Sequence, residues 1–499
     1  MSDPETKASY NQIVKATTLV GGSQIIGILL GIFRTKVMAL LLGLEGIGLI
    51  GLYSAVTGMV GTITGLGIGS SGVRQIAEAV GSGDEKKVAR TILSLRRTVL
   101  VLGTIGMLLT AVLSRPLSQI TFGSDDHAVA IALLSVTLFL GAVSSGQTAL
   151  VQGMRRIADL ARLSVFGAFF GAIFSIPMVF CWGKSGIVPS IIAVSTMSIL
   201  TSWWFARKIP VAKVELPWRE AKSEVQGLIS LGLVFMASSL MSSGVAYLVR
   251  ILVLRQIGLD GVGLYQAANT LSTIYIGFVL NAMGMDFYPR LTAVAQDNAA
   301  CNRMVNEQTE VGLVVAAPGI LATLTFAPIV MELFYSAQFV PAYDVLRWQI
   351  LGMFLRVVSW PLGFAIMAKG KGKIFFWTEF AAHTLHVALL WLGLYLFGLE
   401  GTGIAFFILY IFYTALILAV VRRLSGFNWS AANLRRGLAI AACIGLAFLL
   451  PRILPGTVAL AIGTLLTLAV GIYCLRVLRL LMGPGWLDGF RPKAKARAG

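Results

Sequence analysis

Four basic side chains interrupt long apolar stretches of the sequence: Arg34, Lys36, Arg250 and Arg356. An isolated Arg or Lys at the centre of a bilayer costs about 2.5–3.5 kcal/mol on insertion scales, so several of them are unfavourable on a surface that faces lipid. Guanidinium and ammonium groups are strong partners for phosphate and carboxylate. We expect these cations to face a hydrated cavity that receives an anionic ligand; the alternative is structural pairing with acidic residues.

A second group of ionisable residues shares one face of a predicted helix. Glu379, His383 and His386 stand at positions i, i+4 and i+7, which lie on the same side of an α-helix. His titrates near neutral pH, and carboxylates inside a membrane often carry protons, so the three are candidates for ion coupling. Structural hydrogen bonding between helices is the alternative. Metal binding would require at least three convergent ligands, which spacing alone cannot show, and we predict neither a metal nor a cofactor.

The elements that must position these residues are membrane helices. Of the 499 residues, 57% are apolar and only 12% are charged, and the mean hydropathy is +0.83, whereas about 25% of residues in soluble domains are charged. Runs of about 20 apolar residues, each long enough to span a bilayer, recur along the whole chain. The sequence therefore predicts an all-α integral membrane protein with about 14 transmembrane helices, near residues 13–42, 47–73, 92–114, 128–152, 163–183, 187–206, 227–256, 262–288, 311–335, 344–368, 374–397, 402–421, 437–454 and 457–480.

The basic residues follow this topology. The formal net charge is +18, but most Lys and Arg fall in alternate loops or at helix ends beside them, as the positive-inside rule predicts when both termini are cytoplasmic. No nucleic-acid partner is needed to explain the charge. We expect Arg255 and Arg347, near the opposite ends of their helices, to extend toward the outer interface. The four cysteines have no metal or disulfide spacing and are predicted to be small core residues.

A repeated septet indicates two similar halves. "GLEGIGL" begins at Gly43 and "GLDGVGL" at Gly258, while a degenerate copy at Gly183 is matched by "GLEGTGI" at Gly398, and both intervals are 215 residues. Each copy lies between two apolar runs, where Gly permits a positive φ and close helix approach. Parallel repeats of this kind place a substrate near the midplane between the halves, with alternating access. The predicted parts are two six-helix lobes at 1–210 and 211–425, followed by two extra helices and a basic cytoplasmic tail at 426–499.

Several stretches resemble the polysaccharide-transport branch of the MOP superfamily of exporters. They are "ALLLGLEGIGL", "GLGIGSSGVRQIAE", "LVQGMRRIADL", "FYPRLTAVAQD" and, most specifically, "SAQFVPAYDVLRWQILGMFLRVVSWPLGFAIMAKGK". The resemblance covers about residues 10–425. It implies basic residues in the first, seventh and tenth helices, matched here by Lys36, Arg250 and Arg356, whereas Arg34 is supported by its depth alone.

This resemblance implies a flippase for O-antigen or similar repeat units. Such a protein moves an undecaprenyl-diphosphate-linked oligosaccharide from the cytoplasmic to the periplasmic leaflet of the bacterial inner membrane by alternating access through a cationic central cavity, and makes no covalent bond. Its expected partners are the lipid-linked glycan and membrane lipids, with a polysaccharide polymerase and a chain-length regulator in the same pathway.

The sequence leaves three alternative functions to consider. A lipid II flippase would share the cationic cavity and the helix count, and the tenth-helix stretch favours the oligosaccharide branch over it. A drug exporter of the MOP type, handling organic cations, would carry deep carboxylates, whereas here the deep charges are positive. A membrane-embedded polymerase or glycosyltransferase would need acids or bases on a sizeable outer loop, and the predicted outer loops are short, so we predict that the chain is not an enzyme.

Overall fold

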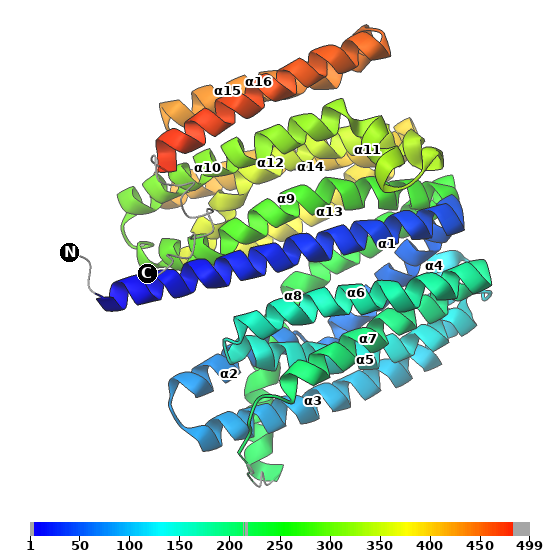
Figure 1. Ribbon diagram of the computed structural model, residues 1–499, viewed down its shortest axis with the longest axis vertical. Helices are drawn as coiled ribbons and strands as arrows, with labels where there is room; N and C mark the ends of the chain where they lie inside the picture. Colours follow the sequence, from blue (N-terminus) through cyan, green and yellow to red (C-terminus); the bar gives the residue numbers. More distant parts are fainter. Residues whose placement is uncertain (1–3, 213, 215–217, 483–499) are drawn as a thin grey trace, which may run out of the picture. The chain divides into compact units, whose positions relative to one another are not determined.

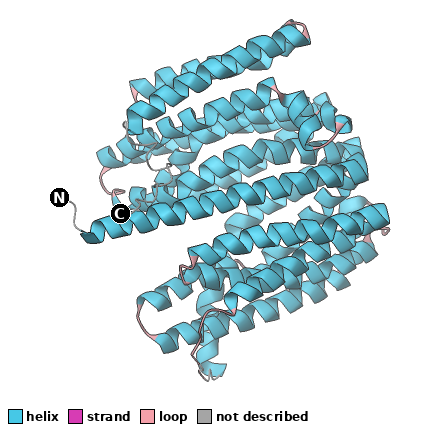
Figure 2. Ribbon diagram, viewed as in Figure 1, coloured by secondary structure: helices cyan, strands magenta, loops and turns pink. Residues whose placement is uncertain are grey.

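Every regular element in the described part of the chain is a helix (Figure 2). The computed structural model describes residues 4–212, 214 and 218–482; the predicted basic tail, at 483–499, lies outside the described residues. Figure 1 labels the helices in chain order. Their bounds are α1 (Pro4–Gly65), α2 (Ile68–Gly81), α3 (Glu85–Val112), α4 (Ser114–Phe122), α5 (Ala128–Gly153), α6 (Ile157–Trp182), α7 (Ile187–Ala206), α8 (Trp218–Ile257), α9 (Leu259–Ala293), α10 (Asn298–Thr325), α11 (Ala327–Phe334), α12 (Tyr343–Ala368), α13 (Gly372–Phe397), α14 (Glu400–Ser425), α15 (Ala431–Ile453) and α16 (Gly456–Met482).

The helices account for the predicted crossings. Eleven segments among the described residues are long and apolar enough to span a membrane. Two of them, Gly22–Gly65 and Ile157–Ala206, are broken by the glycine turns at Gly43 and Gly183 and so provide two crossings each. Helix α9, with 35 residues, has the length for one more. The resulting fourteen crossings agree with the prediction.

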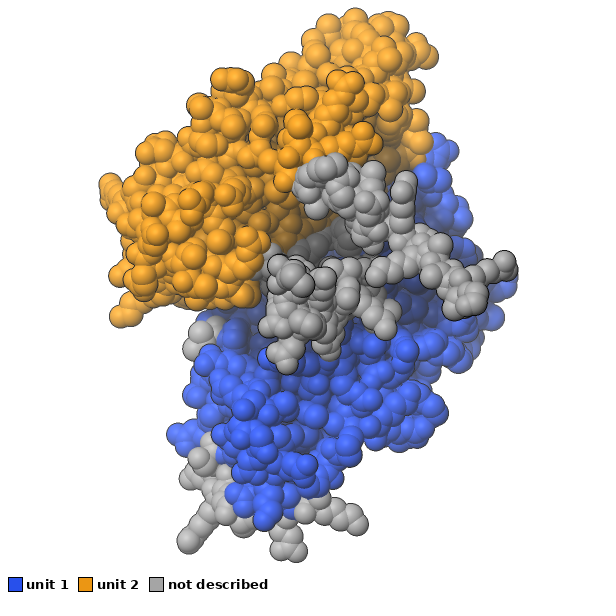
Figure 3. All heavy atoms as spheres, turned by 60° about the vertical axis from the view of Figure 1, so that its left-hand side comes forward, with its two compact units in different colours: residues 1–267, 332–339 blue, residues 268–331, 340–499 orange. Residues whose placement is uncertain are grey.

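The chain forms two compact units (Figure 3). Unit 1 comprises residues 1–267 and 332–339, and unit 2 comprises residues 268–331 and 340–499. The division falls inside α9, so it follows different boundaries from the two lobes expected at 1–210 and 211–425, which remain a prediction. Within unit 1, α3 packs on α5 and α6 on α7; within unit 2, α12 packs on α14 and α10, while α15 and α16 pack on α10.

Helices α3 and α10 begin in the same way. Asp84 caps α3 by accepting hydrogen bonds from the backbone N–H groups of Lys86 and Lys87, at 2.8 and 3.2 Å. Asp297 caps α10 by accepting from Ala299 and Ala300, at 2.8 and 3.1 Å. An acidic cap satisfies N–H groups that have no partner within the helix and complements the positive end of the helix dipole. The same device at corresponding places supports a repeated plan.

The septet glycines adopt the turn conformation that their spacing predicts. Gly43, Gly183, Gly258 and Gly398 have φ values of 65°, 55°, 97° and 57°, in the region that side chains with a Cβ rarely adopt. Each one separates two membrane helices, or two halves of one continuous helical stretch. The predicted role of these glycines is confirmed.

Further glycines of the septets permit close approach between backbones. A Cβ at Gly48 would overlap the carbonyl oxygen of Leu259, and a Cβ at Gly263 would overlap the carbonyl oxygen of Leu44. The contact is reciprocal, because each pair joins the sixth residue of one septet to the second residue of the other. The septets at Gly43 and Gly258 thus pack against one another inside unit 1 through direct backbone contacts, with no side chain between them.

This contact predicts a large and local sensitivity to one methyl group. Gly48→Ala and Gly263→Ala should each destabilise the protein by about 1–3 kcal/mol, because the added Cβ forces apart two rigid backbones. Gly31→Ala is the matched control: it lies in α1, and no atom lies within 4 Å of the place where its Cβ would be, so the change should be neutral or slightly stabilising. Thermal unfolding of the purified protein in detergent measures both, and equal melting temperatures for all three variants would contradict the contact.

Candidate functional site

The two cations of α1, Arg34 and Lys36, differ in their hydrogen-bond partners. Arg34 is half-buried, and its Nε is enclosed without a hydrogen-bond partner among the described residues. The Nζ of Lys36 donates to the backbone carbonyl of Glu332, at 2.6 Å, within unit 1. That carbonyl belongs to the last turn of α11, where carbonyl groups lack partners within the helix and the dipole favours a positive charge. Lys36 is held in place, but its charge is not neutralised by a carboxylate there.

Arg250 is fixed by a neutral amide. Its Nε and Nη2 donate to Oε1 of Gln266, at 3.0 and 2.8 Å, and its Nη1 donates to the carbonyl of Ala246, at 2.6 Å. The guanidinium carbon also lies 5.9 Å from the ring centre of Tyr265. These contacts orient the side chain and engage three of its five N–H donors, yet none of them supplies a negative charge.

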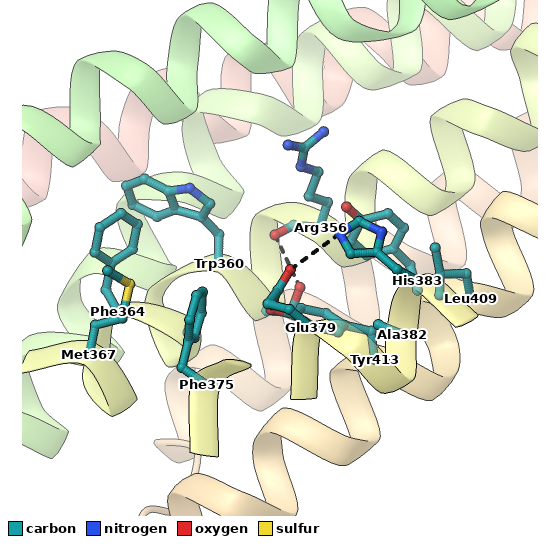
Figure 4. Close-up of a pocket in the computed structure, with 13 residues that line it drawn as sticks. Arg356, Trp360, Phe364, Met367, Phe375, Glu379, Ala382, His383, Leu409 and Tyr413 are labelled. Atoms are coloured by element: carbon teal, nitrogen blue, oxygen red, sulfur yellow. Dashed lines mark hydrogen bonds and ion pairs between the residues drawn. The ribbon is translucent and has the colours of Figure 1, made fainter. Parts of the chain in front are cut away.

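Arg356 lies in unit 2 at a pocket of about 230 Å³ formed by α12, α13 and α14. In the described part of the chain, its guanidinium makes no hydrogen bond or ion pair with another side chain. Figure 4 shows the side chain extending away from the carboxylate of Glu379. Aromatic rings from Trp360, Phe364 and Phe375 form much of the remaining wall.

Glu379 and His383 meet in the same pocket, as the helix spacing predicts. Oε1 of Glu379 accepts a hydrogen bond from the hydroxyl of Tyr413, at 2.5 Å, and Oε2 lies 3.8 Å from Nε2 of His383 (Figure 4). His386 is absent from the pocket wall; its ring centre lies 6.1 Å from that of Phe406. The three residues therefore form a connected pair and a separate histidine.

Other arginines in the membrane segments are structural. Arg347 is 2% exposed and donates through Nη2 to the backbone carbonyl of Phe448 in α15, with its guanidinium carbon 4.7 Å from the Phe448 ring centre. The expectation that Arg347 extends to the outer interface is wrong, because α15 covers it and offers it an acceptor. Arg452 in α15 pairs with Glu400 of α14, at 3.0 Å. These contacts attach the C-terminal helix pair to the rest of unit 2.

The four predicted cations differ from Arg452 in that none of them forms an ion pair among the described residues. No ion pair in the described residues includes Arg34, Lys36, Arg250 or Arg356. The structure places the first three in unit 1 and the fourth in unit 2. Each of these side chains carries a positive charge without a carboxylate partner in the described residues, and each can serve as a counter-charge for an anion.

Two residues of these sites escaped the sequence analysis. Gln266 stands eight residues after the turn at Gly258, and Arg250 stands eight residues before it, so equal distances from a hairpin turn could have paired them. The sequence spacing did not indicate a contact between Tyr413 and Glu379, because the packing of α13 on α14 brings the two residues together.

Comparison with known proteins gives a consistent picture. The family described as "Polysaccharide biosynthesis protein" matches residues 37–344. The lipid III flippase of Escherichia coli (strain K12) is 22% identical over 412 residues, which are 82% of this chain and 98% of the flippase. A putative O-antigen transporter of Shigella flexneri is 23% identical over 372 residues, which are 73% of this chain and 87% of the transporter.

Two solved structures show the fold. The inward-facing multidrug resistance MATE family transporter of the MOP superfamily has a TM-score of 0.67 at 16% identity and covers 83% of this chain and 94% of its own. The lipid II flippase MurJ in an inward closed conformation also has a TM-score of 0.67, at 13% identity, and covers 94% of this chain and 99% of its own. The second likeness extends over more of the chain.

The Arg250–Gln266 contact predicts a non-additive pair of substitutions. Gln266→Leu should destabilise the protein by about 1–3 kcal/mol, because it removes the acceptor of two N–H groups of a half-buried guanidinium. The double variant Arg250→Leu, Gln266→Leu should recover part of this loss, because it removes the charge as well. Thermal unfolding of the two single variants and the double variant measures the coupling, and strictly additive changes would show that the contact contributes nothing.

Proposed function

Because the chain belongs to the family of polysaccharide biosynthesis proteins and has the fold of the MOP superfamily, we propose that it is a flippase for a lipid-linked oligosaccharide. The substrate is an undecaprenyl-diphosphate-linked O-antigen or similar repeat unit, moved from the cytoplasmic to the periplasmic leaflet of a bacterial inner membrane. Both termini are cytoplasmic in this proposal. No covalent bond is made or broken, and a polymerase and a chain-length regulator act on the units delivered.

The observation that carries the proposal is the set of cations without carboxylate partners. A diphosphate needs guanidinium or ammonium groups as counter-charges, and Arg34, Lys36, Arg250 and Arg356 have no acidic partner among the described residues. Arg356 is the clearest case, because its guanidinium makes no side-chain contact of this kind at the edge of a pocket. We infer that the four cations share the task of holding the diphosphate during alternating access.

The membrane potential can drive such a movement. With the cell interior negative, outward transfer of anionic charge gains about 2.3 kcal/mol per charge per 100 mV, and a diphosphate carries about two charges. The sequence contains no GxxxxGK[ST] phosphate loop. We therefore propose export driven by the potential, with an ion exchanged in addition if the Glu379–His383 pair is functional.

The sign of the charges within the membrane and the chemistry of the substrate distinguish the competing functions. A lipid II flippase would use the same cations, and the likeness to one supports the fold alone, so the sugar carried by the substrate decides between the two. Another MOP-type exporter, of cationic drugs, would need deep carboxylates, whereas the four cations have no carboxylate partner among the described residues. A membrane polymerase or glycosyltransferase would yield a new glycosidic bond, which chemical analysis of the lipid-linked product detects.

Arg356→Gln should abolish most export without harming the fold. The guanidinium has no partner to lose inside the described protein, whereas a charge-assisted contact to phosphate is worth about 1.5–3 kcal/mol, which corresponds to about a tenfold or greater loss. Arg356→Lys should retain part of the activity, and Arg476→Gln in α16, whose side chain is exposed, is the matched control.

The measurement uses a host whose own copy of the gene is deleted. Surface polysaccharide and lipid-linked units on the inner leaflet are quantified together with the amount of flippase in the membrane. Accumulated units with intact glycosidic bonds and little surface polymer are the expected result for Arg356→Gln. Normal surface polymer in that variant, at normal protein level, would remove Arg356 from the site.

Ion coupling should depend on Glu379 and His383 and not on His386. We propose that Glu379, which contacts both Tyr413 and His383, exchanges the coupling proton, because the three groups line one pocket. Transport into proteoliposomes with an imposed pH gradient should become insensitive to that gradient in Glu379→Gln and His383→Ala. His386→Ala is the control, since His386 packs on Phe406 outside the pocket. Unchanged pH dependence in all three variants would dismiss coupling at this pair.

A further inference from the structure

Unit 1 contains a groove that is lined largely by serines, threonines and glycines. Two hollows of about 520 and 560 Å³ share Gly69, Ser70, Gly141 and Ser145, so they lie next to each other; we call the two together the hydroxyl groove. Its wall is built from α1, α2, α3, α5, α7 and α8. Each hollow has the size of a typical small-molecule site. None of the candidate cations or ionisable residues described above contributes to it.

The hydroxyl groups of the groove are available for hydrogen bonds. Thr57, Thr62 and Thr64 each donate to a carbonyl of their own helix, at 2.9, 2.8 and 3.0 Å, so their oxygen lone pairs remain free to accept. Ser70 and Ser145 make no hydrogen bond with the described residues and can both donate and accept. The wall thus offers several neutral acceptors and, at Ser70 and Ser145, hydroxyl donors as well.

Two glycines of the groove, Gly58 and Gly141, are not explained by helix packing. Gly is an unfavourable residue inside a helix, and elsewhere in unit 1 it is needed where backbones touch, as at Gly48. At Gly58 and Gly141, by contrast, no atom lies within 4 Å of the place where a Cβ would be. A side chain at either position would project into open space along the groove wall. Glycine there keeps the groove wide.

The chemistry of the wall selects a class of ligand. The described residues that line the two hollows include no Asp, Glu, Lys, Arg or His, so none of them offers a counter-charge to a diphosphate. A purely apolar ligand would cover the hydroxyl groups of Ser70 and Ser145 without giving them a partner, which is unfavourable. A neutral ligand with many hydroxyl or amide groups satisfies the wall.

We propose that the hydroxyl groove binds the uncharged sugar portion of the lipid-linked substrate. This inference rests on the proposed function and assigns the two chemical parts of one substrate to different residues: the cations hold the diphosphate, and the groove receives the glycan. The described residues that line the two hollows include no aromatic ring on which a sugar face would stack, so hydrogen bonds are the specific contacts that we assign to the sugar. Binding of this strength permits release after passage.

The test compares two probes that differ only in the sugar. One is the lipid-linked oligosaccharide extracted from a host that lacks the flippase and accumulates it; the other is undecaprenyl diphosphate. Their affinities are measured for the purified full-length protein, for the groove-filling variants Gly58→Leu and Gly141→Leu, and for the double variant Ser70→Ala, Ser145→Ala. Gly471→Leu in α16 is the matched control, because its Cβ position is equally open and lies outside the groove.

The groove variants should bind the oligosaccharide probe about tenfold more weakly and undecaprenyl diphosphate within about twofold of the unmodified protein. Gly471→Leu should bind both normally. Unchanged binding of both probes, or an equal loss of both, would overturn the inference. The serine variant keeps the test decisive if a leucine variant does not fold. If the unmodified protein binds neither probe, the proposed function itself fails, which is a different result from failure of the groove alone.

Discussion

A positive charge placed within an apolar helix bundle must be either neutralised or hydrated. This constraint separates the arginines of the chain into two kinds. Arg347 is buried beneath α15 and donates to a backbone carbonyl, and Arg452, which is more exposed, pairs with a carboxylate. Arg250 and Arg356 find no carboxylate in the described residues. An uncompensated guanidinium in hydrocarbon is costly, so these side chains require water or an anionic ligand, and the proposed function follows from that requirement.

The repeated glycine septets help to position the helices that carry these charges. Their first glycines turn the chain between membrane helices, and their later glycines allow backbones to touch. The reciprocal contact between Gly48 and Leu259 and between Gly263 and Leu44 joins corresponding residues of two repeats. The turn at Gly258 also brings Arg250 opposite Gln266. The position of a functional side chain thus depends on a local backbone conformation that few residues other than glycine adopt.

The sequence predicted the features that depend on local chain properties. Hydropathy and length predicted the helices, and spacing predicted the positive φ of Gly43 and the neighbourhood of Glu379 and His383. Partners from distant segments were not predictable. The acceptor of Lys36 is a backbone carbonyl 296 residues away. Every residue has a backbone carbonyl, so the sequence of residue types does not indicate which one accepts. Arg347 was expected at the interface because nothing in the sequence says that α15 covers it.

The most direct test of the account is the contribution of the four cations to binding of the diphosphate. The affinity of the purified protein for undecaprenyl diphosphate is compared with that for undecaprenol, in the unmodified chain and in a variant carrying Arg34→Gln, Lys36→Gln, Arg250→Gln and Arg356→Gln. The account predicts a strong preference for the diphosphate that disappears in the variant. A preference that persists without the four cations would contradict it.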